Sequence, residues 1–232
     1  MHHTEHHFQG SERIRDIVIG MSDGLTVPFA LTAGLSGAVS TNTIIITAGI
    51  AEIIAGSIAM GLGGYLAGKT EYDHYFAEQK REYEEVERVP EREKQEIEDI
   101  LNDYGISDRV KKDFVNELAL DKDKWVEFMM KFELCLEMPA ANRARNSAMT
   151  IAGAYIFGGF VPLASYFFTS TPVHGLYYSV GVTILALAVF GYLKSKATGQ
   201  SPWSGALKTT LIGAVAAGAA FFIAKLVSSG GM

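Results

Sequence analysis

The chain has 232 residues, of which 48% are hydrophobic, and it carries a formal net charge of −6 at pH 7. A negative balance argues against a nucleic-acid-binding surface and favours a cationic partner, and the single cysteine excludes a framework of disulfides. Charge is concentrated between residues 69 and 145, and five apolar runs of about 20 residues or more lie outside that segment. These candidate membrane spans are 17–39, 43–68, 147–169, 174–193 and 206–227. We therefore expect an all-α membrane protein with five transmembrane helices.

The basic residues predict how the chain is oriented in the membrane. Arg and Lys precede the first span, occur throughout 69–145, and recur in the connection between the fourth and fifth spans. The connections at 40–42 and 170–173 contain neither residue type. By the positive-inside rule, the N-terminus and 69–145 are cytosolic, and the C-terminus lies on the opposite side. The expected organisation is a tail (1–15), two spans (16–68), the inserted segment (69–145) and three spans (146–232).

The tail contains four histidines that could bind metal, namely His2, His3, His6 and His7. Histidine is a common metal ligand, but a cluster of this kind also occurs in tails that have no metal function. Both interpretations of the tail stay open.

The first span carries a carboxylate at Asp23 and a proline at Pro28. Proline has no N–H, so the carbonyl oxygen of Gly24 loses its partner within the helix. A carboxylate beside a freed carbonyl predicts a cation site, because ionisable residues within spans usually have a functional role. The alternative is that Pro28 only kinks the helix and Asp23 reaches the membrane surface.

The second span is predicted to continue into the cytosol as one long helix over 43–89, because its charged part has no Gly or Pro before Pro90. Glycines recur every seven residues in its apolar part, at Gly49, Gly56 and Gly63, and such a stripe favours close approach of another helix. Glu52 lies on the stripe, so we expect it at a helix contact. Met60 lies on a neighbouring face, where its thioether would favour a transition metal over Mg²⁺ or Ca²⁺.

The inserted segment is predicted to form three helices, over 69–88, 91–103 and 108–138, separated by Pro90 and by the sequence YGIS at 104–107. Acidic residues are paired at helical spacing on these helices, and a cation near such pairs would relieve their repulsion. The paired residues are Glu82 with Glu85, Glu93 with Glu96, and Met129 with Glu133, next to Met130. The alternative interpretation is a solvated acidic surface with lysine partners. The segment is therefore a candidate cytosolic metal-binding domain.

The last three spans contain no Asp or Glu, since the last acidic residue is Glu137. Charged ligands within the membrane can therefore come only from the first two spans. A pathway on the twofold axis of a homodimer would double Asp23, Glu52 and Met60, which makes a dimer an economical arrangement.

Three long motifs carry a resemblance to a known family: SDGLTVPFALTAGLSGA, SIAMGLGGYLAGKTEYDHY and EMPAANRARNSAMTIAGAYIFGGFVPL. They closely resemble the vacuolar iron transporter family of plant type. The resemblance implies a homodimer of five-span subunits in the vacuolar membrane that moves Fe²⁺ from cytosol to vacuole in exchange for protons. It implies metal ligands at Glu82, Glu85, Glu93, Glu96, Met129, Met130 and Glu133, and a pathway through Asp23, Met60 and Glu52. Fe²⁺ is then the substrate, with Zn²⁺, Co²⁺, Mn²⁺ or Ni²⁺ as surrogates, and no cofactor is expected.

Two other functions stay open at this level. One is a divalent-metal channel without proton coupling, and the other is a membrane-anchored metal sensor or buffer. Asp23 argues against the anchor, which has no use for a carboxylate within the membrane. An enzyme is not expected, because the spans contain no Ser/His/Asp set, phosphate loop or histidine-rich zinc motif.

Overall fold

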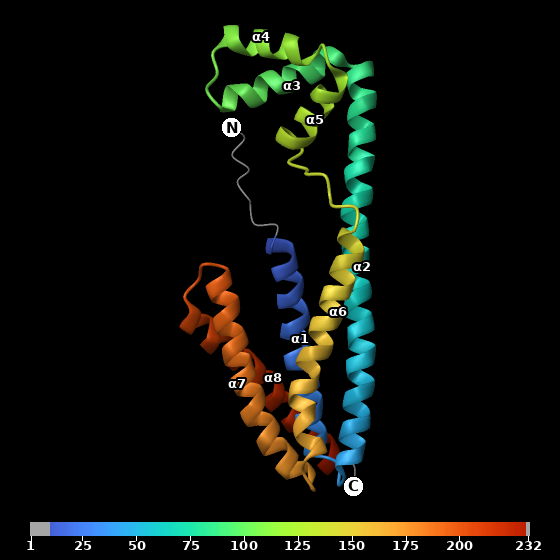
Figure 1. Cartoon of the computed structure of the whole chain (residues 1–232), viewed down its shortest axis with the longest axis vertical. Coiled ribbons are helices and arrows are strands. Elements are labelled where there is room, and N and C mark those ends of the chain that lie inside the picture. The colour runs from blue at the N-terminus through green and yellow to red at the C-terminus, as the bar shows by residue number, and fades with distance from the viewer. Residues whose placement is uncertain (1–9, 231–232) are drawn as a thin grey trace. The chain divides into compact units, whose positions relative to one another are not determined.

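The computed structural model describes residues 10–230, and all regular elements in that part of the chain are helices (Figure 1). The elements are α1 (Gly10–Ser36), α2 (Asn42–Arg88), α3 (Pro90–Asp103), α4 (Asp108–Leu118), α5 (Lys122–Phe132), α6 (Arg143–Phe167), α7 (Pro172–Ala197) and α8 (Pro202–Gly230). Five of them are long and apolar enough to cross a membrane, namely α1, α2, α6, α7 and α8. The predicted all-helical fold and number of candidate spans are confirmed for the described residues, whereas the four histidines of the tail lie outside them.

The chain divides into two compact units. One, here called the membrane unit, runs to Tyr65 and resumes at Arg145, so it holds α1, the first part of α2, and α6 to α8. The other, here called the inserted unit, comprises Leu66–Ala144 and holds the charged end of α2 together with α3, α4 and α5.

Small residues allow α2 and α6 to pack closely in the membrane unit. A Cβ atom at Gly49 would lie 2.5 Å from the side chain of Leu163, and one at Gly56 would lie 2.4 Å from the Tyr155 hydroxyl. These two glycines form the helix contact that the glycine stripe predicted. Gly63, the third member of the stripe, has nothing within 4 Å of such a Cβ atom, so this residue does not take part in the contact.

The first helix differs from its predicted limits at both ends. It already begins at Gly10, and it ends at Ser36 although the apolar run continues to residue 39. The end is set by a tight turn, because the amide of Gly37 donates to the carbonyl oxygen of Gly34 at 3.1 Å. The helix passes through Pro28 without ending.

The inserted unit contradicts the prediction of one helix over 108–138, because this region forms α4 and α5. The break follows from Asp121, whose backbone is extended and whose side chain accepts a hydrogen bond from the Lys124 amide at 3.3 Å. The second helix ends early because the amides of Glu133 and Leu134 both donate to Met129 O, and Cys135 adopts a φ of 53°. The break predicted at 104–107 is confirmed.

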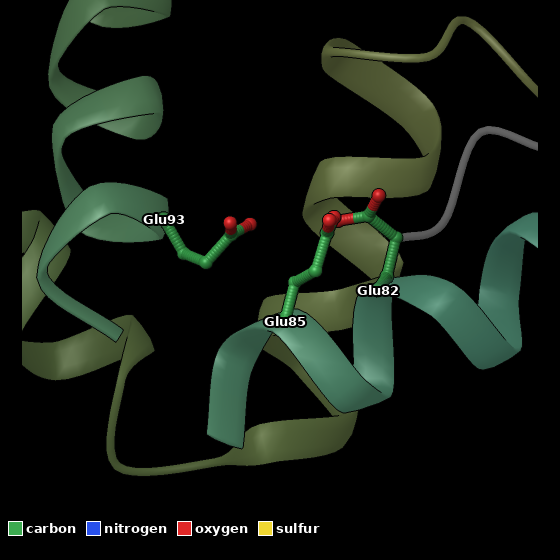
Figure 2. Close-up of side chains that lie close together, drawn as sticks. All are labelled: Glu82, Glu85 and Glu93. Carbon is green, nitrogen blue, oxygen red and sulfur yellow. The ribbon is translucent and has the colours of Figure 1, made fainter. Parts of the chain in front are cut away.

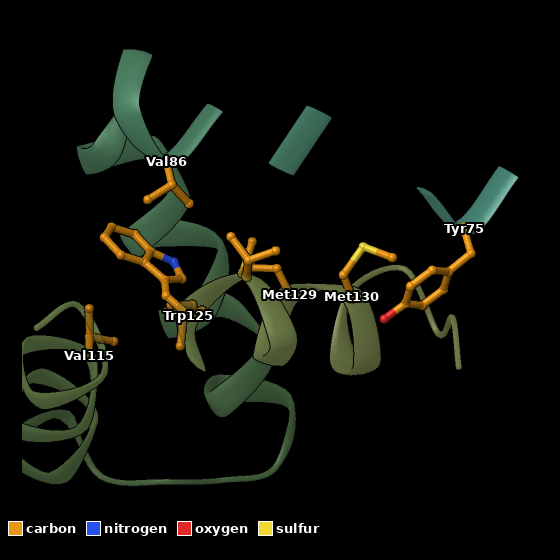
Figure 3. Close-up of a cluster of buried hydrophobic side chains, with 8 residues drawn as sticks. Tyr75, Val86, Val115, Trp125, Met129 and Met130 are labelled. Carbon is orange, nitrogen blue, oxygen red and sulfur yellow. The ribbon is translucent and has the colours of Figure 1, made fainter. Parts of the chain in front are cut away.

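A single apolar core holds the inserted unit together (Figure 3). Trp125, Met129 and Met130 of α5 pack there with residues from α2, α3 and α4. The buried members are Tyr75, Val86, Ile97, Val115, Trp125, Val126, Met129 and Met130. Full burial of an apolar side chain of this size stabilises a fold by about 1.5–3 kcal/mol. This core fixes the faces of α2, α3 and α5 on which the acidic residues lie.

Candidate metal-binding cluster and membrane carboxylates

Five glutamates of the inserted unit come together in two overlapping groups, which we call the glutamate cluster. One group holds Glu82, Glu85 and Glu93 (Figure 2), and the other holds Glu93, Glu96 and Glu133. Within each group, one carboxylate oxygen from each residue lies within 4.8 Å of the others. Oxygen atoms at this spacing can surround a divalent cation, and Glu93 belongs to both groups.

The local sequence explains why these side chains converge. Glu82 and Glu85 are three residues apart, so they share one face of α2, as Glu93 and Glu96 share one face of α3. Val89 adopts a non-helical conformation and Pro90 begins α3, so the chain turns between the two acidic pairs. Glu133 follows directly after α5. The cluster therefore depends on one turn and on the end of one helix.

Two members of the cluster are unusually buried for carboxylates. Glu82 and Glu93 are each 1% exposed, and each has an Oε2 atom that is buried and lacks a hydrogen-bond partner among the described residues. An isolated buried charge is strongly unfavourable, so such a group either holds a proton or binds a cation. These two oxygen atoms are the clearest structural sign that the cluster suits a metal ion.

Burial and mutual repulsion raise the pKa of three of the glutamates. Burial is the main reason that the pKa of Glu82 rises to about 7, and the nearby carboxylate of Glu133 adds to it. The pKa of Glu93 also rises to about 7, through burial and then through repulsion by Glu96. Glu133 is exposed as a whole residue, but burial of its carboxyl group and repulsion by Glu96 raise its pKa to about 7 as well. At neutral pH the cluster therefore holds protons that a metal ion could displace.

Two arginines partly compensate the charge of the cluster. Arg81 lies 3.6 Å from Glu85 and 3.6 Å from the Oε1 atom of Glu82, and Arg92 lies 3.1 Å from Glu96. Both guanidinium groups are largely exposed, so each ion pair contributes little to stability. The arginines leave the buried Oε2 atoms of Glu82 and Glu93 without a partner among the described residues.

The structure places the two predicted methionine ligands in the apolar core. Met129 is fully buried and Met130 is 2% exposed, and both pack with the core residues in Figure 3. Packing alone accounts for their positions, since methionine fills irregular gaps in cores. Their role as sulfur ligands stays a prediction.

The membrane unit brings two predicted pathway residues to one tyrosine. The Tyr155 hydroxyl donates a hydrogen bond to the Glu52 carboxylate, and the Asp23 carboxylate is close enough to interact with this hydroxyl electrostatically. Glycine permits the approach, because a Cβ atom at Gly24 would lie 2.4 Å from the Tyr155 carbonyl oxygen. Met60 lies on α2 and is half-buried, and its role as a pathway ligand stays a prediction.

Sequence reasoning missed Tyr155. The available signal was a tyrosine within an apolar span, since a buried hydroxyl requires a hydrogen-bond partner. The second carboxylate oxygen of Glu52 is buried without a partner among the described residues. Asp23, Tyr155 and Glu52 thus form a polar site in the membrane unit, carried by α1, α6 and α2.

Comparison with known proteins identifies the family of the chain. The model of the VIT family matches residues 14–225. "Vacuolar iron transporter 1" of Tulipa gesneriana is 53% identical, over 98% of this chain and 92% of its own length. "Vacuolar iron transporter 1" of Arabidopsis thaliana is 53% identical, over 97% of this chain and 90% of its own length.

A fungal protein gives a more distant match. "Protein CCC1" of Saccharomyces cerevisiae is 45% identical, over 92% of this chain and 69% of its own length. The two plant relatives are named as transporters, which agrees with the expectation that the chain is not an enzyme. The family resemblance inferred from the three motifs is confirmed, and the chain belongs to the VIT family.

Proposed function

We propose that this protein transports Fe²⁺ into the vacuole, across the vacuolar membrane, in exchange for protons. The names of the plant relatives support both the substrate and the compartment. Metal binding is supported by one structural observation, the buried Oε2 atoms of Glu82 and Glu93, which have no hydrogen-bond partner among the residues that the structure describes. The five candidate spans support a multi-pass membrane protein.

In this proposal the inserted unit is cytosolic and collects the metal ion at the glutamate cluster. Carboxylate oxygens accept Fe²⁺, Mn²⁺, Co²⁺, Ni²⁺ and Zn²⁺, while the thioethers of Met129 and Met130 would favour the softer of these ions. Binding displaces protons, because a carboxylate must be ionised to act as a ligand. Metal loading therefore weakens as the cytosol becomes more acidic.

The membrane step uses the polar site of Asp23, Tyr155 and Glu52, with Met60 as a further ligand. An ionised carboxylate at this depth is stabilised by a cation or by a proton, so the two compete for the same site. A higher proton concentration on the vacuolar side would displace the metal ion there. Tyr155 acts as a positioning residue, because its hydroxyl holds the Glu52 carboxylate.

We further propose that two subunits form a homodimer with the pathway on its twofold axis. Only the first two spans supply carboxylates to the membrane unit, and a twofold axis would double Asp23, Glu52 and Met60. The N-terminus would then be cytosolic and the C-terminus vacuolar, as the distribution of Lys and Arg predicts.

The test is Fe²⁺ uptake into proteoliposomes with and without an imposed proton gradient. Uptake should rise when the interior is acidic and fall to background in Asp23→Asn. Asp113→Asn, an exposed acid on α4, is the matched control and should retain uptake. Wild-type uptake that ignores the gradient would indicate a channel instead.

A second comparison separates the roles of the two sites. Glu82→Gln with Glu93→Gln should lower the rate or the apparent affinity and leave measurable uptake. Metal binding by the inserted unit without any uptake by the wild-type protein would indicate a membrane-anchored sensor or buffer. Normal uptake by Asp23→Asn would place the obligatory site elsewhere.

A further inference from the structure

A buried polar cluster joins four helix ends on one side of the membrane unit, and we call it the Tyr166 latch. It lies where α1 ends, α2 begins, α6 ends and α7 begins, and these ends meet at the bottom of Figure 1. Tyr166 is at its centre and is only 1% exposed. This side carries the short connections at 37–41 and 168–171, which contain no Lys or Arg, so the orientation proposed above makes it the vacuolar side.

Side-chain hydroxyls attach α6 to α1. The Tyr166 hydroxyl lies 2.8 Å from Ser36 Oγ and 3.3 Å from the carbonyl oxygen of Thr32. Ser36 also donates to the carbonyl oxygen of Thr32 at 2.7 Å. Ser36 and Thr32 are more than nine-tenths buried, so these hydrogen bonds are shielded from water.

A single amide attaches α2 to the end of α6. Asn42 Nδ2 lies 3.1 Å from the carbonyl oxygen of Tyr166 and 2.6 Å from that of Thr169. The same nitrogen lies 3.1 Å from Thr169 Oγ1. Asn42 is the first residue of α2, so this contact fixes the position where the second helix begins.

The beginning of α7 completes the latch. Gly175 lies against the Tyr166 ring, because a Cβ atom at this position would be 2.4 Å from Tyr166 Cδ1. One turn further along, Ser179 Oγ donates to the carbonyl oxygen of Pro162 at 2.8 Å. All four helix ends are therefore held by contacts within or next to one tyrosine.

The latch joins the same three helices that carry the polar membrane site. Tyr166 lies on α6 with Tyr155, about 16 Å away along the helix, and Asn42 lies on α2 with Glu52, about 15 Å away. Thr32 and Ser36 lie on α1 with Asp23. A relative movement of these three helices that opened this side would have to break the hydrogen bonds of the latch.

We propose that the Tyr166 latch is the gate that closes the vacuolar side of the pathway and that opens once in each transport cycle. The proposal rests on the proposed function, since a carrier must open each side in turn. Hydrogen bonds suit this role because water can replace each partner that is lost when the latch opens. Each bond therefore contributes little net free energy to the closed state, and the closed and open states stay close in free energy. Gly175 and Ser179 let α7 lie against the latch without a bulky side chain that would obstruct its opening.

The test measures access to a buried position one turn further along α7 than Ser179, on the inner side of the latch. Thr183 lies on α7 and is fully buried, with 0% of its surface exposed. Its hydroxyl has no hydrogen-bond partner among the described residues. Thr183→Cys therefore introduces a reporter thiol without removing a hydrogen bond between described residues. The experiment uses a Cys135→Ser background, which removes the one native cysteine. A membrane-impermeant thiol reagent is added separately to each side of sealed vesicles.

Two variants weaken the latch at different bonds. Tyr166→Phe keeps the ring and removes the hydroxyl, and Asn42→Leu keeps the approximate size and removes the amide donor without adding a charge. Each removes at least one hydrogen bond, so each should raise the rate of labelling from the vacuolar side at least about fivefold, the change in an opening equilibrium expected for one hydrogen bond of ordinary net strength. Tyr177→Phe is the matched control, because Tyr177 is 70% exposed on α7, and it should leave the rate unchanged.

Each result decides for or against the latch. A rise from the vacuolar side only, in both variants, supports it, and a rise from the cytosolic side only overturns it. An unchanged rate in both variants, or an equal rise from both sides, overturns it. Labelling requires no iron, so a one-sided rise in a protein that takes up no Fe²⁺ would support the latch and refute the proposed substrate. Proton-coupled Fe²⁺ uptake by the wild type, with labelling unchanged in both variants, would support the proposed function and refute the latch.

Discussion

Replacing Glu93 by glutamine should stabilise the metal-free inserted unit at high pH. In the folded protein the pKa of Glu93 is about 7, against 4.5 for an unperturbed glutamate. The folded state therefore binds more protons than the unfolded state between these two values, and its stability falls as pH rises. The difference corresponds to about 3 kcal/mol once Glu93 is fully ionised, because each pH unit contributes about 1.36 kcal/mol.

Glutamine has the size of protonated glutamate and carries no charge to bury. Glu93→Gln should therefore match the wild type near pH 4, below the unfolded pKa, and exceed its free energy of unfolding by up to about 3 kcal/mol near pH 8. Its stability should also depend less on pH, because Glu93 no longer titrates and no longer repels Glu82. Glu91→Gln, whose wild-type side chain is 84% exposed on the same helix, should change neither value appreciably.

Tryptophan fluorescence measures this directly on the full chain. Trp125 is 4% exposed in the core of the inserted unit, whereas Trp203 is 77% exposed and can be removed as Trp203→Phe. Denaturant unfolding followed at Trp125, at several pH values and without metal, gives the free energies. A wild type whose stability stays level or rises between pH 5 and pH 8 would refute the reasoning, as would a Glu93→Gln variant less stable than the wild type near pH 8.

Three further changes test packing, capping and ligand chemistry. Gly24→Ala should destabilise the membrane unit by about 1–3 kcal/mol, since the new Cβ atom would lie 2.4 Å from the Tyr155 carbonyl oxygen; Gly153→Ala meets nothing within 4 Å, so its melting temperature should not fall. Asp121→Ala removes the cap of α5 and should cost about 1 kcal/mol in the same fluorescence assay, whereas an unchanged midpoint would show that the cap is dispensable. Met130→Leu conserves volume, so the free energy of unfolding should change by less than about 1.5 kcal/mol. If the Met130 sulfur is a ligand, calorimetry should show weaker binding of Co²⁺ or Ni²⁺ to this variant and unchanged binding of Mn²⁺.

The sequence predicted the spans because length and hydropathy alone decide them. It also predicted which acids share a helix face, since spacing of three residues places Glu82 beside Glu85 and Glu93 beside Glu96. It did not predict how the helices are arranged, because that depends on the turn at Val89 and on the packing of the core. Spacing singled out the acidic pairs and the neighbouring methionines one helix at a time, and the family resemblance was needed to predict that they act together as one set of ligands.

Two errors show where local patterns are insufficient. The helix expected over 108–138 was wrong because Asp121 competes for the backbone as a cap, and an aspartate at this position looks like any exposed acid of a helix. The Tyr155 contact was missed because hydropathy treats a tyrosine in a span as apolar. Its hydroxyl nevertheless needs a partner, and Asp23 and Glu52 are the acidic residues of the membrane unit's apolar spans that lie near it.

The raised pKa values bear on how reversibly the glutamate cluster could bind metal. A cluster of ordinary glutamates would be fully ionised at neutral pH, so it would attract a cation strongly and release it slowly. With three pKa values of about 7, incoming metal must displace protons, which lowers its apparent affinity near neutral pH. For a transporter that must pass its ion onward, this is an advantage, because a small local rise in proton concentration assists release. For a storage site it is a disadvantage, so the burial of Glu82 and Glu93 favours a transfer role over a buffering role.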